Sequence, residues 1–280
     1  MQKSKLLVAL LGALSAMPVF AADAPAPAIT ANVGFTSDYV FNGISQTFRS
    51  PAIQGGLDYA AANGLYIGTW ASNISGNQYT NASMELDVYG GYNGKVSDDL
   101  GYQIGLMNVT YPNGKAFNGI DTATNTLTTP YKRWDTTEAI LGATWKSLNV
   151  KLTYTLTDWY GINNSGFAPT MWADGSSTAD SADADLGSKG STYVEANYTF
   201  EVSEGLNITA HAGHQKIQNF SKLNYTDYKL AVSKLYQGFN FGLAYTTTNA
   251  TDNTLYHVIA NGDDKVLSGN ILAASVSRSF

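Results

Sequence analysis

The fold is decided by the stretch Met84-Glu85-Leu86-Asp87-Val88-Tyr89, in which apolar and acidic residues alternate. Successive side chains of a β-strand point to opposite faces of a sheet, so Met84, Leu86 and Val88 share one face and the two carboxylates share the other. A soluble sandwich and a membrane barrel both produce this pattern, but they place the polar face oppositely. The remainder of the chain has to show which face meets water.

Alternation of this kind recurs about a dozen times along the 280 residues. No long window shows a helical period and no Pro- or Ser-rich linker divides the chain, which predicts a single all-β domain. The expected strands are 30–45, 51–61, 64–74, 83–93, 100–110, 136–146, 149–159, 191–201, 205–215, 224–235, 238–248 and 268–280.

The connections between these strands are alternately short and long. Short turns are expected at 62–64, 93–95, 146–148, 201–204 and 236–238, several with the Gly or Asn that hairpin turns require. Longer connections are expected at 75–82, 111–135, 160–190, 216–223 and 249–267. Outer-membrane barrels have an even strand number, short periplasmic turns and longer external loops, whereas a sandwich has no reason to sort its loops by length. The sequence therefore predicts a transmembrane antiparallel up-and-down β-barrel of about 12 strands, with both termini periplasmic.

The polar residues that interrupt the apolar face lie where a membrane barrel tolerates them. Lys146, Lys234 and Arg278 fall at the expected periplasmic strand ends, where a long basic side chain can reach the headgroups; at mid-membrane it would cost about 2–4 kcal/mol. An aromatic girdle at that interface is expected from Tyr59, Tyr92, Trp145, Phe200 and Phe280. Three residues break the alternation, which predicts a bulge in 64–74 and in 100–110: Tyr66, Trp70 and Met107.

The first 22 residues have the organisation of a secretory signal peptide. Lys3 and Lys5 precede an apolar run from Leu6 to about Met17, and Val19-Phe20-Ala21 is a small-residue cleavage signal. The alternative is an N-terminal core helix. Nowhere does the chain reach the roughly 18–20 apolar residues of a membrane-spanning helix, so membrane residence requires a closed sheet. Residues 1–22 are expected to be cleaved, leaving 23–280 as one outer-membrane β-barrel domain.

The composition favours a barrel over a soluble protein. The chain holds 27 Gly, 18 Tyr and 11 Phe, and 14% of its residues are charged, against about 25% in soluble domains. The absence of cysteine excludes thiol chemistry and zinc–thiolate sites. The formal charge is −6, and it becomes −8 when Lys3 and Lys5 leave with the signal peptide. An acidic chain of this kind is a poor nucleic-acid binder.

Several segments carry a family resemblance. They are Gly34-Phe35-Thr36-Ser37-Asp38-Tyr39, Gly43-Ile44-Ser45-Gln46-Thr47, Pro51-Ala52-Ile53-Gln54-Gly55-Gly56-Leu57-Asp58-Tyr59, Gly64-Leu65-Tyr66-Ile67-Gly68-Thr69-Trp70-Ala71-Ser72-Asn73, Glu85-Leu86-Asp87-Val88-Tyr89-Gly90-Gly91-Tyr92, Tyr225-Thr226-Asp227-Tyr228-Lys229-Leu230 and Val276-Ser277-Arg278-Ser279-Phe280. These segments resemble the TorF-type family of proteobacterial outer-membrane porins. The resemblance covers essentially the whole mature chain but not residues 111–135 and 160–190. It implies an outer-membrane barrel, and Phe280 resembles the terminal aromatic that the outer-membrane barrel assembly machinery reads.

The residues expected to line the lumen lie at the polar positions of the alternating strands. They are Asp38, Asp58, Glu85, Asp87, Glu138, Lys151, Glu195, His211, Asp227 and Lys229. About seven acids against two lysines would raise the local cation concentration, so an open pore is expected to prefer cations. The alternative is that these charges pair internally and plug a closed barrel; Asp227 and Lys229, two residues apart on one face, could do so.

Other chemistries have weaker signals. His211 and His214 are three apart, which in a strand puts them on opposite faces, so a shared metal is not expected. An outer-membrane lipase would need a serine activated by a histidine, and only His214 has suitable parity, without a matching Ser–Asn pair. The aspartate-rich stretch from Asp174 to Asp185 lacks the order of a calcium loop and indicates a solvated loop. A further group of aromatic residues could pack together or fold inward to stack a sugar: Trp134, Trp159, Tyr160, Phe167 and Trp172.

The sequence therefore predicts a porin-like channel in the outer membrane of a Gram-negative bacterium, without enzymatic activity or a cofactor. Small hydrophilic solutes or ions would diffuse through it passively, and the outer-membrane lipid would surround it. The alternative is a closed structural or adhesin-type barrel without transport. Barrels of eight strands fill their interiors and those of sixteen conduct water, so a barrel of twelve leaves both alternatives open.

Overall fold

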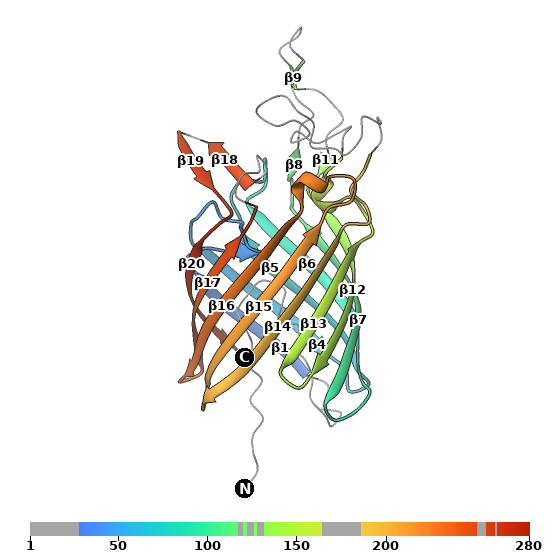
Figure 1. Ribbon diagram of the computed structural model, residues 1–280, viewed down its shortest axis with the longest axis vertical. Helices are drawn as coiled ribbons and strands as arrows, with labels where there is room; N and C mark the ends of the chain where they lie inside the picture. Colours follow the sequence, from blue (N-terminus) through green and yellow to red (C-terminus); the bar gives the residue numbers. More distant parts are fainter. Residues whose placement is uncertain are drawn as a thin grey trace.

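The structure is a computed structural model that describes residues 28–116, 120–121, 126–127, 132–163, 186–250, 256–260 and 262–280. Twelve antiparallel strands form a closed barrel (Figure 1). In chain order they are β1 (Ala28–Thr36), β4 (Ala52–Ala60), β5 (Leu65–Asn73), β6 (Met84–Lys95), β7 (Leu100–Thr110), β12 (Thr136–Trp145), β13 (Leu148–Thr155), β14 (Thr192–Ser203), β15 (Leu206–Lys216), β16 (Tyr225–Tyr236), β17 (Phe239–Thr248) and β20 (Ile271–Ser279). Because β1 pairs with both β4 and β20, the sheet closes on itself and the predicted fold class is confirmed.

The other elements are short and lie in the connections. They are β2 (Val40–Phe41), β3 (Ile44–Ser45), β8 (Lys115–Ala116), β9 (Ile120–Asp121), β10 (Thr126–Leu127), β11 (Lys132–Arg133), β18 (His257–Ala260), β19 (Asp263–Val266) and the 3₁₀ turns η1 (Trp159–Gly161) and η3 (Ser221–Leu223). No helix in the described part of the chain is long and apolar enough to cross a membrane.

The connections are sorted by length between the two ends of the barrel, as the sequence predicts. One end, which we call the turn end, carries the short connections 61–64, 96–99, 146–147, 204–205 and 237–238. The opposite end, the loop end, carries 37–51, 74–83, 111–135, 156–191, 217–224 and 249–270. Phe280 lies at the turn end, where its backbone exchanges hydrogen bonds of 2.8 and 3.1 Å with Ala31 of the first strand (Figure 1).

The alternation places apolar side chains on the outside of the barrel and polar side chains inside, as in a membrane barrel. On β6, Met84 and Val88 point outward and are 40% and 49% exposed, whereas Asp87 between them is 0% exposed. The same apolar outer face continues around the barrel, and the residues of the predicted girdle all lie exposed on it: Tyr59, Tyr92, Trp145, Phe200 and Phe280. The Arg278 guanidinium lies 5.3 Å from the ring of Phe280 and the Lys146 ammonium 5.4 Å from that of Trp145, which places both cations at the turn end.

The bulges predicted for 64–74 and 100–110 are wrong. β5 pairs without interruption with β4 and β6, and β7 does so with β6 and β12, so their alternation is intact. Tyr66 and Met107 are buried and Trp70 is half-buried, because all three face the barrel interior. The register shift that the structure does show lies on β14, between Glu201 and Ser203.

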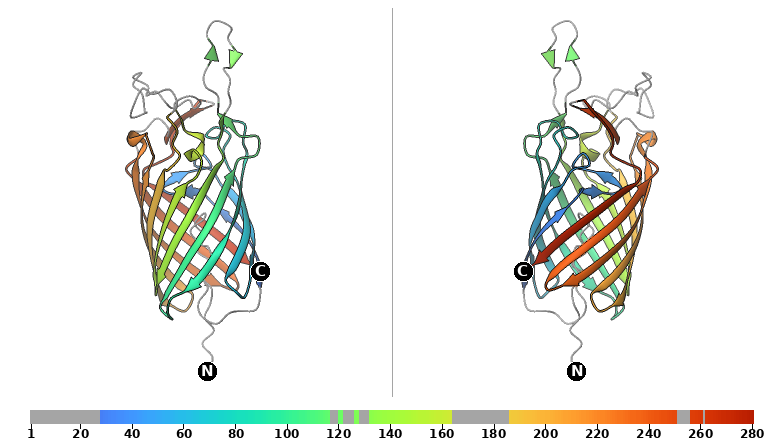
Figure 2. Two further views of the ribbon diagram at one scale, coloured as in Figure 1. Left: turned by 90° about the vertical axis from the view of Figure 1, so that its right-hand side faces the viewer. Right: turned by 90° about the vertical axis from the view of Figure 1, so that its left-hand side faces the viewer.

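The first predicted strand, 30–45, is too long. β1 ends at Thr36, whose hydroxyl donates to the carbonyl of Asp38 over 2.8 Å. The chain then forms the β2–β3 hairpin, which lies within the barrel near the loop end (Figure 2). Asn42 and Gly43 at its tip have φ of 45° and 82°, the two positive values that a type I′ turn requires. Residues 37–51 are therefore a long inward-folded loop, and Asp38 belongs to this loop rather than to a strand.

Candidate functional site

The predicted lumen residues form a belt of charge inside the barrel. Seven of them are buried, namely Asp38, Glu85, Asp87, Glu138, Glu195, His211 and Asp227, while Lys151 and Lys229 are half-buried. Apart from Asp38, these residues lie in the middle or loop-end half of their strands, and we call them the charged belt. Asp58 lies nearer the turn end and accepts a 2.6 Å hydrogen bond from the Tyr89 hydroxyl. Around it the interior is polar but mostly uncharged, with Asn32, Asn93, Gln103, Asn207 and Ser277 on inward positions.

One side of the belt, on β13–β16, is paired. Lys151 Nζ lies 2.7 Å from Glu195 Oε1, and His211 Nε2 lies 2.9 Å from Asp227 Oδ2. The Tyr193 hydroxyl donates to Asp227 Oδ1 over 2.8 Å. Lys229 interacts electrostatically with both Glu195 and Asp227. The direct ion-pair partner of Asp227 is therefore His211 on the adjacent strand, rather than Lys229 on its own strand. Two acids face two lysines and a histidine here, so this side is close to neutral.

The adjoining side of the belt, on β6 and β12, is acidic and has few ion-pair partners. Glu85 accepts 2.8 Å hydrogen bonds from the hydroxyls of Tyr39 and Tyr111. Glu138 has the charge of Lys151 nearby. Neither oxygen of Asp87 has a hydrogen-bond partner among the described residues. The excess negative charge of the interior is thus concentrated on one wall.

The β2–β3 hairpin crosses the barrel between these two walls. At one end of the loop, Tyr39 reaches Glu85 on β6; at the other, the hairpin tip reaches β16. A Cβ on Gly43 would lie 2.7 Å from the Cβ of Asp227, so the tip touches the paired side of the belt. The hairpin is therefore in contact with both walls of charge.

Aromatic side chains from several loops pack around this hairpin and fill the loop end. Tyr79 and Tyr111 stack with ring centroids 4.5 Å apart, and Trp134 meets Tyr79 edge-on at 5.5 Å. Trp159 and Tyr160 of η1 join the same buried cluster. Trp134, Trp159 and Tyr160 therefore pack inward on other aromatic residues. Phe167 and Trp172 lie outside the described residues, as do the stretch 174–185 and the predicted signal peptide.

Arg49 ties the inward-folded loop to the connection 249–270. Its guanidinium donates to the carbonyls of Val266, Ser268 and Asn270 at 3.0, 2.5 and 3.2 Å. Asp38 within the loop accepts from the hydroxyls of Ser45 and Thr47. Burial raises the pKa of Asp38, against the opposing effect of these hydrogen bonds and of the Arg49 charge.

We expect Arg49→Ala to loosen this loop without unfolding the barrel. Hydrogen bonds from a charged donor contribute about 1.5–3 kcal/mol, and the loss should appear as faster hydrogen exchange of the Ser45 amide, which donates to the Leu267 carbonyl over 2.7 Å. Arg133→Ala is the matched control, because Arg133 is exposed and pairs only locally with Asp135 in the described residues. Unchanged exchange at Ser45 would refute the anchoring role of Arg49.

The histidines lie as the alternation predicts. His211 faces the interior, where Nδ1 lies 2.8 Å from Asn197 Oδ1, and His214 faces outward near the loop end. His214 Nδ1 lies 2.8 Å from the hydroxyl of Thr226. Its hydroxyl partner is therefore a threonine, whereas the lipase chemistry considered from the sequence needs a serine.

The sequence interpretation did not identify Tyr39, Gly43 and Arg49 as residues of the interior. The dipeptide Asn42-Gly43 is a strong hairpin signal and could have revealed the turn within 30–45. No local signal marks Tyr39 or Arg49, because their partners are far away in the sequence.

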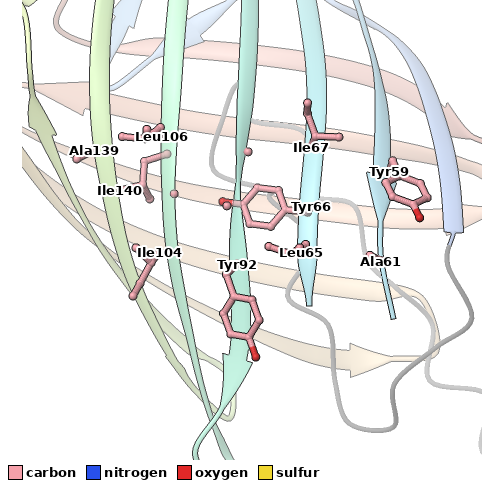
Figure 3. A pocket seen from close by; sticks show the side chains of 13 residues that line it. Tyr59, Ala61, Leu65, Tyr66, Ile67, Tyr92, Ile104, Leu106, Ala139 and Ile140 are labelled. Atoms are coloured by element: carbon pink, nitrogen blue, oxygen red, sulfur yellow. The ribbon is translucent and has the colours of Figure 1, made fainter. Parts of the chain in front are cut away.

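A separate pocket lies in the wall formed by β4–β7 and β12 (Figure 3). Tyr66 and Ile140 come to it from the inner face, while outward-facing residues such as Leu65, Ile67 and Ile104 supply most of its lining. The pocket is apolar and does not include any residue of the charged belt. It therefore forms no part of the candidate pore.

One bacterial family, described as "Bacterial protein of unknown function (Gcw_chp)", matches residues 21–280. This match does not name the TorF-type porins, so that resemblance stays a prediction. No curated protein matches the chain. Similar solved structures include a KdgM porin, with 9% identity over 90% of this chain and 99% of the other and a TM-score of 0.49. A NanC porin has 12% identity over 90% and 99% of the two chains and a TM-score of 0.49. OprD of Pseudomonas aeruginosa has 12% identity over 90% and 66% and a TM-score of 0.35. Similarity at this level says nothing of what passes through the barrel.

Proposed function

We propose that this chain, which belongs to the Gcw_chp family of bacterial proteins of unknown function, is a porin-like channel of the outer membrane through which small solutes or ions diffuse passively. Its closed barrel with an apolar outer face supports a position in lipid, because the twelve strands form a closed sheet without a free edge. In this proposal residues 1–22 are a signal peptide, 23–280 form the single barrel domain, the turn end faces the periplasm, and Phe280 is read by the barrel assembly machinery.

The acidic wall inside the barrel is the main support for this proposal. A sealed structural barrel gains nothing from placing Glu85, Asp87 and Glu138 on one wall with only one lysine among the described residues near them. In a water-filled path, the same carboxylates lower the energy of a passing cation and raise that of an anion. The paired side on β13–β16 contributes little net charge, so the preference for cations comes from β6 and β12.

Reversal potentials under a KCl gradient test this proposal. The refolded protein in a planar bilayer should pass a steady current whose reversal potential lies toward that of K⁺. Glu138→Gln and Asp87→Asn should each shift the reversal potential toward zero, because each removes an ionisable carboxyl group from the acidic wall. Asp98→Asn is the matched control, since Asp98 is exposed in the turn 96–99. Anion preference of the wild type, or equal shifts in the control, would contradict cation selection by this wall.

The second candidate is a closed barrel without transport, which the aromatic packing at the loop end favours. Tyr111, Trp134, Trp159 and Tyr160 are each less than 10% exposed, and they lie across the same end as the β2–β3 hairpin. A protein that refolds to the barrel but passes no current would support this candidate.

A further inference from the structure

Asp87 is an unusual residue in this interior because it is fully buried and yet unpaired. It is 0% exposed, and neither of its carboxylate oxygens has a hydrogen-bond partner. Thr136 lies in the same row of the sheet, since Asp87 pairs with Val109 of β7 and Val109 pairs with Thr136 of β12. The Thr136 hydroxyl oxygen is also buried without a partner. Buried polar groups are almost always hydrogen-bonded, so two orphaned groups in one row of the sheet indicate a missing partner such as water or an ion.

Two further carboxylates surround this position. Glu85 and Glu138 are 2% and 5% exposed, and both interact electrostatically with Asp87. Lys151 is near Glu138 but is already in contact with Glu195 at 2.7 Å. Three acids therefore lie in this part of the belt with a single basic side chain, Lys151, near them.

The groups around these acids are aromatic rather than basic. Tyr39 and Tyr111 donate their hydroxyl protons to Glu85, so those protons are not available to Asp87. Tyr39 meets Trp70 edge-on with centroids 5.4 Å apart, and Tyr111 meets Tyr160 at 6.0 Å. Tyr39 and Tyr160 both lie close enough to Asp87 to interact with its charge. Carboxylates combined with aromatic rings are the environment that binds an alkylammonium group, by a charge-assisted hydrogen bond and cation–π contacts.

The alternative of a divalent metal fits less well. No group of three or more acidic or histidine side chains among the described residues is arranged to hold a metal ion. A calcium or magnesium ion needs about six oxygen ligands at short distance, whereas an ammonium head needs only one carboxylate and a few acceptors.

From these observations we propose that Asp87, with Glu85, Glu138 and the tyrosines of the loop end, forms a binding site for a small organic cation with an ammonium head. Asp87 makes the direct ion pair, the Thr136 hydroxyl accepts a second ammonium proton, and Glu85 is held in place by Tyr39 and Tyr111. Access of the cation from the lumen rests on the proposed channel, whereas binding by the folded protein in detergent does not require conduction.

The test uses the refolded mature chain in detergent micelles, with ethylammonium chloride as the probe and sodium chloride at equal ionic strength as the reference. Ethylammonium should raise the unfolding temperature of the wild type by a few degrees above the sodium reference, because it binds the folded state alone. Calorimetric titration should show binding to Asp87→Asn that is weaker by about tenfold or more. Asp98→Asn is the control that changes the same charge at the exposed turn end.

Asp87→Asn should itself fold, because it removes a buried unpaired charge without changing shape, and its unfolding temperature in sodium chloride should exceed that of the wild type. If Asp87→Asn does not refold, Glu138→Gln is the second variant to test. It should also bind ethylammonium more weakly than the wild type. Equal stabilisation of the wild type by sodium and ethylammonium, or equal binding by wild type and Asp87→Asn, would overturn the site. Binding without any current in bilayers would leave the site standing and refute the proposed channel instead.

Discussion

Removal of the β2–β3 hairpin is expected to raise the single-channel conductance several-fold. Replacement of Val40–Ser45 by two glycines withdraws the segment that crosses the barrel from the wall of Glu85 to the wall of Asp227 (Figure 2). Ile44 and Phe48 then lose their place in the buried cluster around Tyr225, which loosens the packing of the loop end. The wall of the barrel should survive, because residues 37–51 contribute no strand to the closed sheet.

The matched control deletes residues 120–127, whose paired strands β9 and β10 lie beyond the barrel mouth (Figure 2). Its conductance should equal that of the wild type. If deletion of Val40–Ser45 left the conductance unchanged while heat-modifiable mobility showed a folded barrel, the hairpin would not be the constriction.

Leu230→Arg is expected to destabilise the barrel by about 2–4 kcal/mol in lipid vesicles, the cost of a basic side chain near the membrane midplane. Leu230 lies in the middle of β16, points outward and is 56% exposed, and it pairs across the sheet with Ala210 and Tyr245. The measurement is a denaturant titration of the refolded protein, followed by gel mobility with and without heating.

Tyr236→Arg on the same strand and the same face is the control. Tyr236 ends β16 at the turn end, where an arginine reaches the headgroups and costs only about 0–1 kcal/mol. Lys234 already lies on this face nearby. Equal losses in the two variants would show that the outer face does not meet a membrane with its centre near Leu230.

The wall of the barrel could be predicted from the sequence because its determinants are local. Alternation along 84–89 fixes which side chains share a face, and the sorting of connections by length fixes the two ends. Both follow from short-range geometry, and neither needs knowledge of distant contacts. The inward direction of Glu85, Asp87, Glu138, Glu195 and Asp227 followed from the same parity.

The filling of the barrel could not be predicted in this way, because it depends on contacts between residues far apart. The contacts that hold Val40 to Ser45 inside the barrel come from distant parts of the chain. Tyr39 donates to Glu85, the Ser45 amide donates to Leu267, and Arg49 donates to three carbonyls of the connection 249–270. Tyr66, Trp70 and Met107 were misread for a related reason. An apolar residue in a membrane barrel was expected to face lipid, but here the interior is itself packed with aromatic side chains.

The sequence left two alternatives for the lumen charges, internal pairing or an unpaired acidic lining. Each of them describes one wall of the barrel. On β13–β16, Lys151 with Glu195 and His211 with Asp227 make the internally paired arrangement. On β6 and β12, the acids remain largely unpaired, as a cation-preferring pore requires. Pairing of Asp227 with His211 needed the register between β15 and β16, in which Gly213 faces Asp227, and single-strand parity does not contain that information.

We infer that the barrel encloses a water-filled path lined by the inward-facing side chains. Single-cysteine variants can probe this path, since the chain has no cysteine of its own. Asn197→Cys faces the interior beside His211, and Tyr198→Cys, the next residue, faces outward with 51% exposure. A bulky charged thiol reagent should reduce the bilayer current of Asn197→Cys stepwise and leave that of Tyr198→Cys unchanged. The absence of steady current before modification, or equal responses of the two variants, would contradict the account.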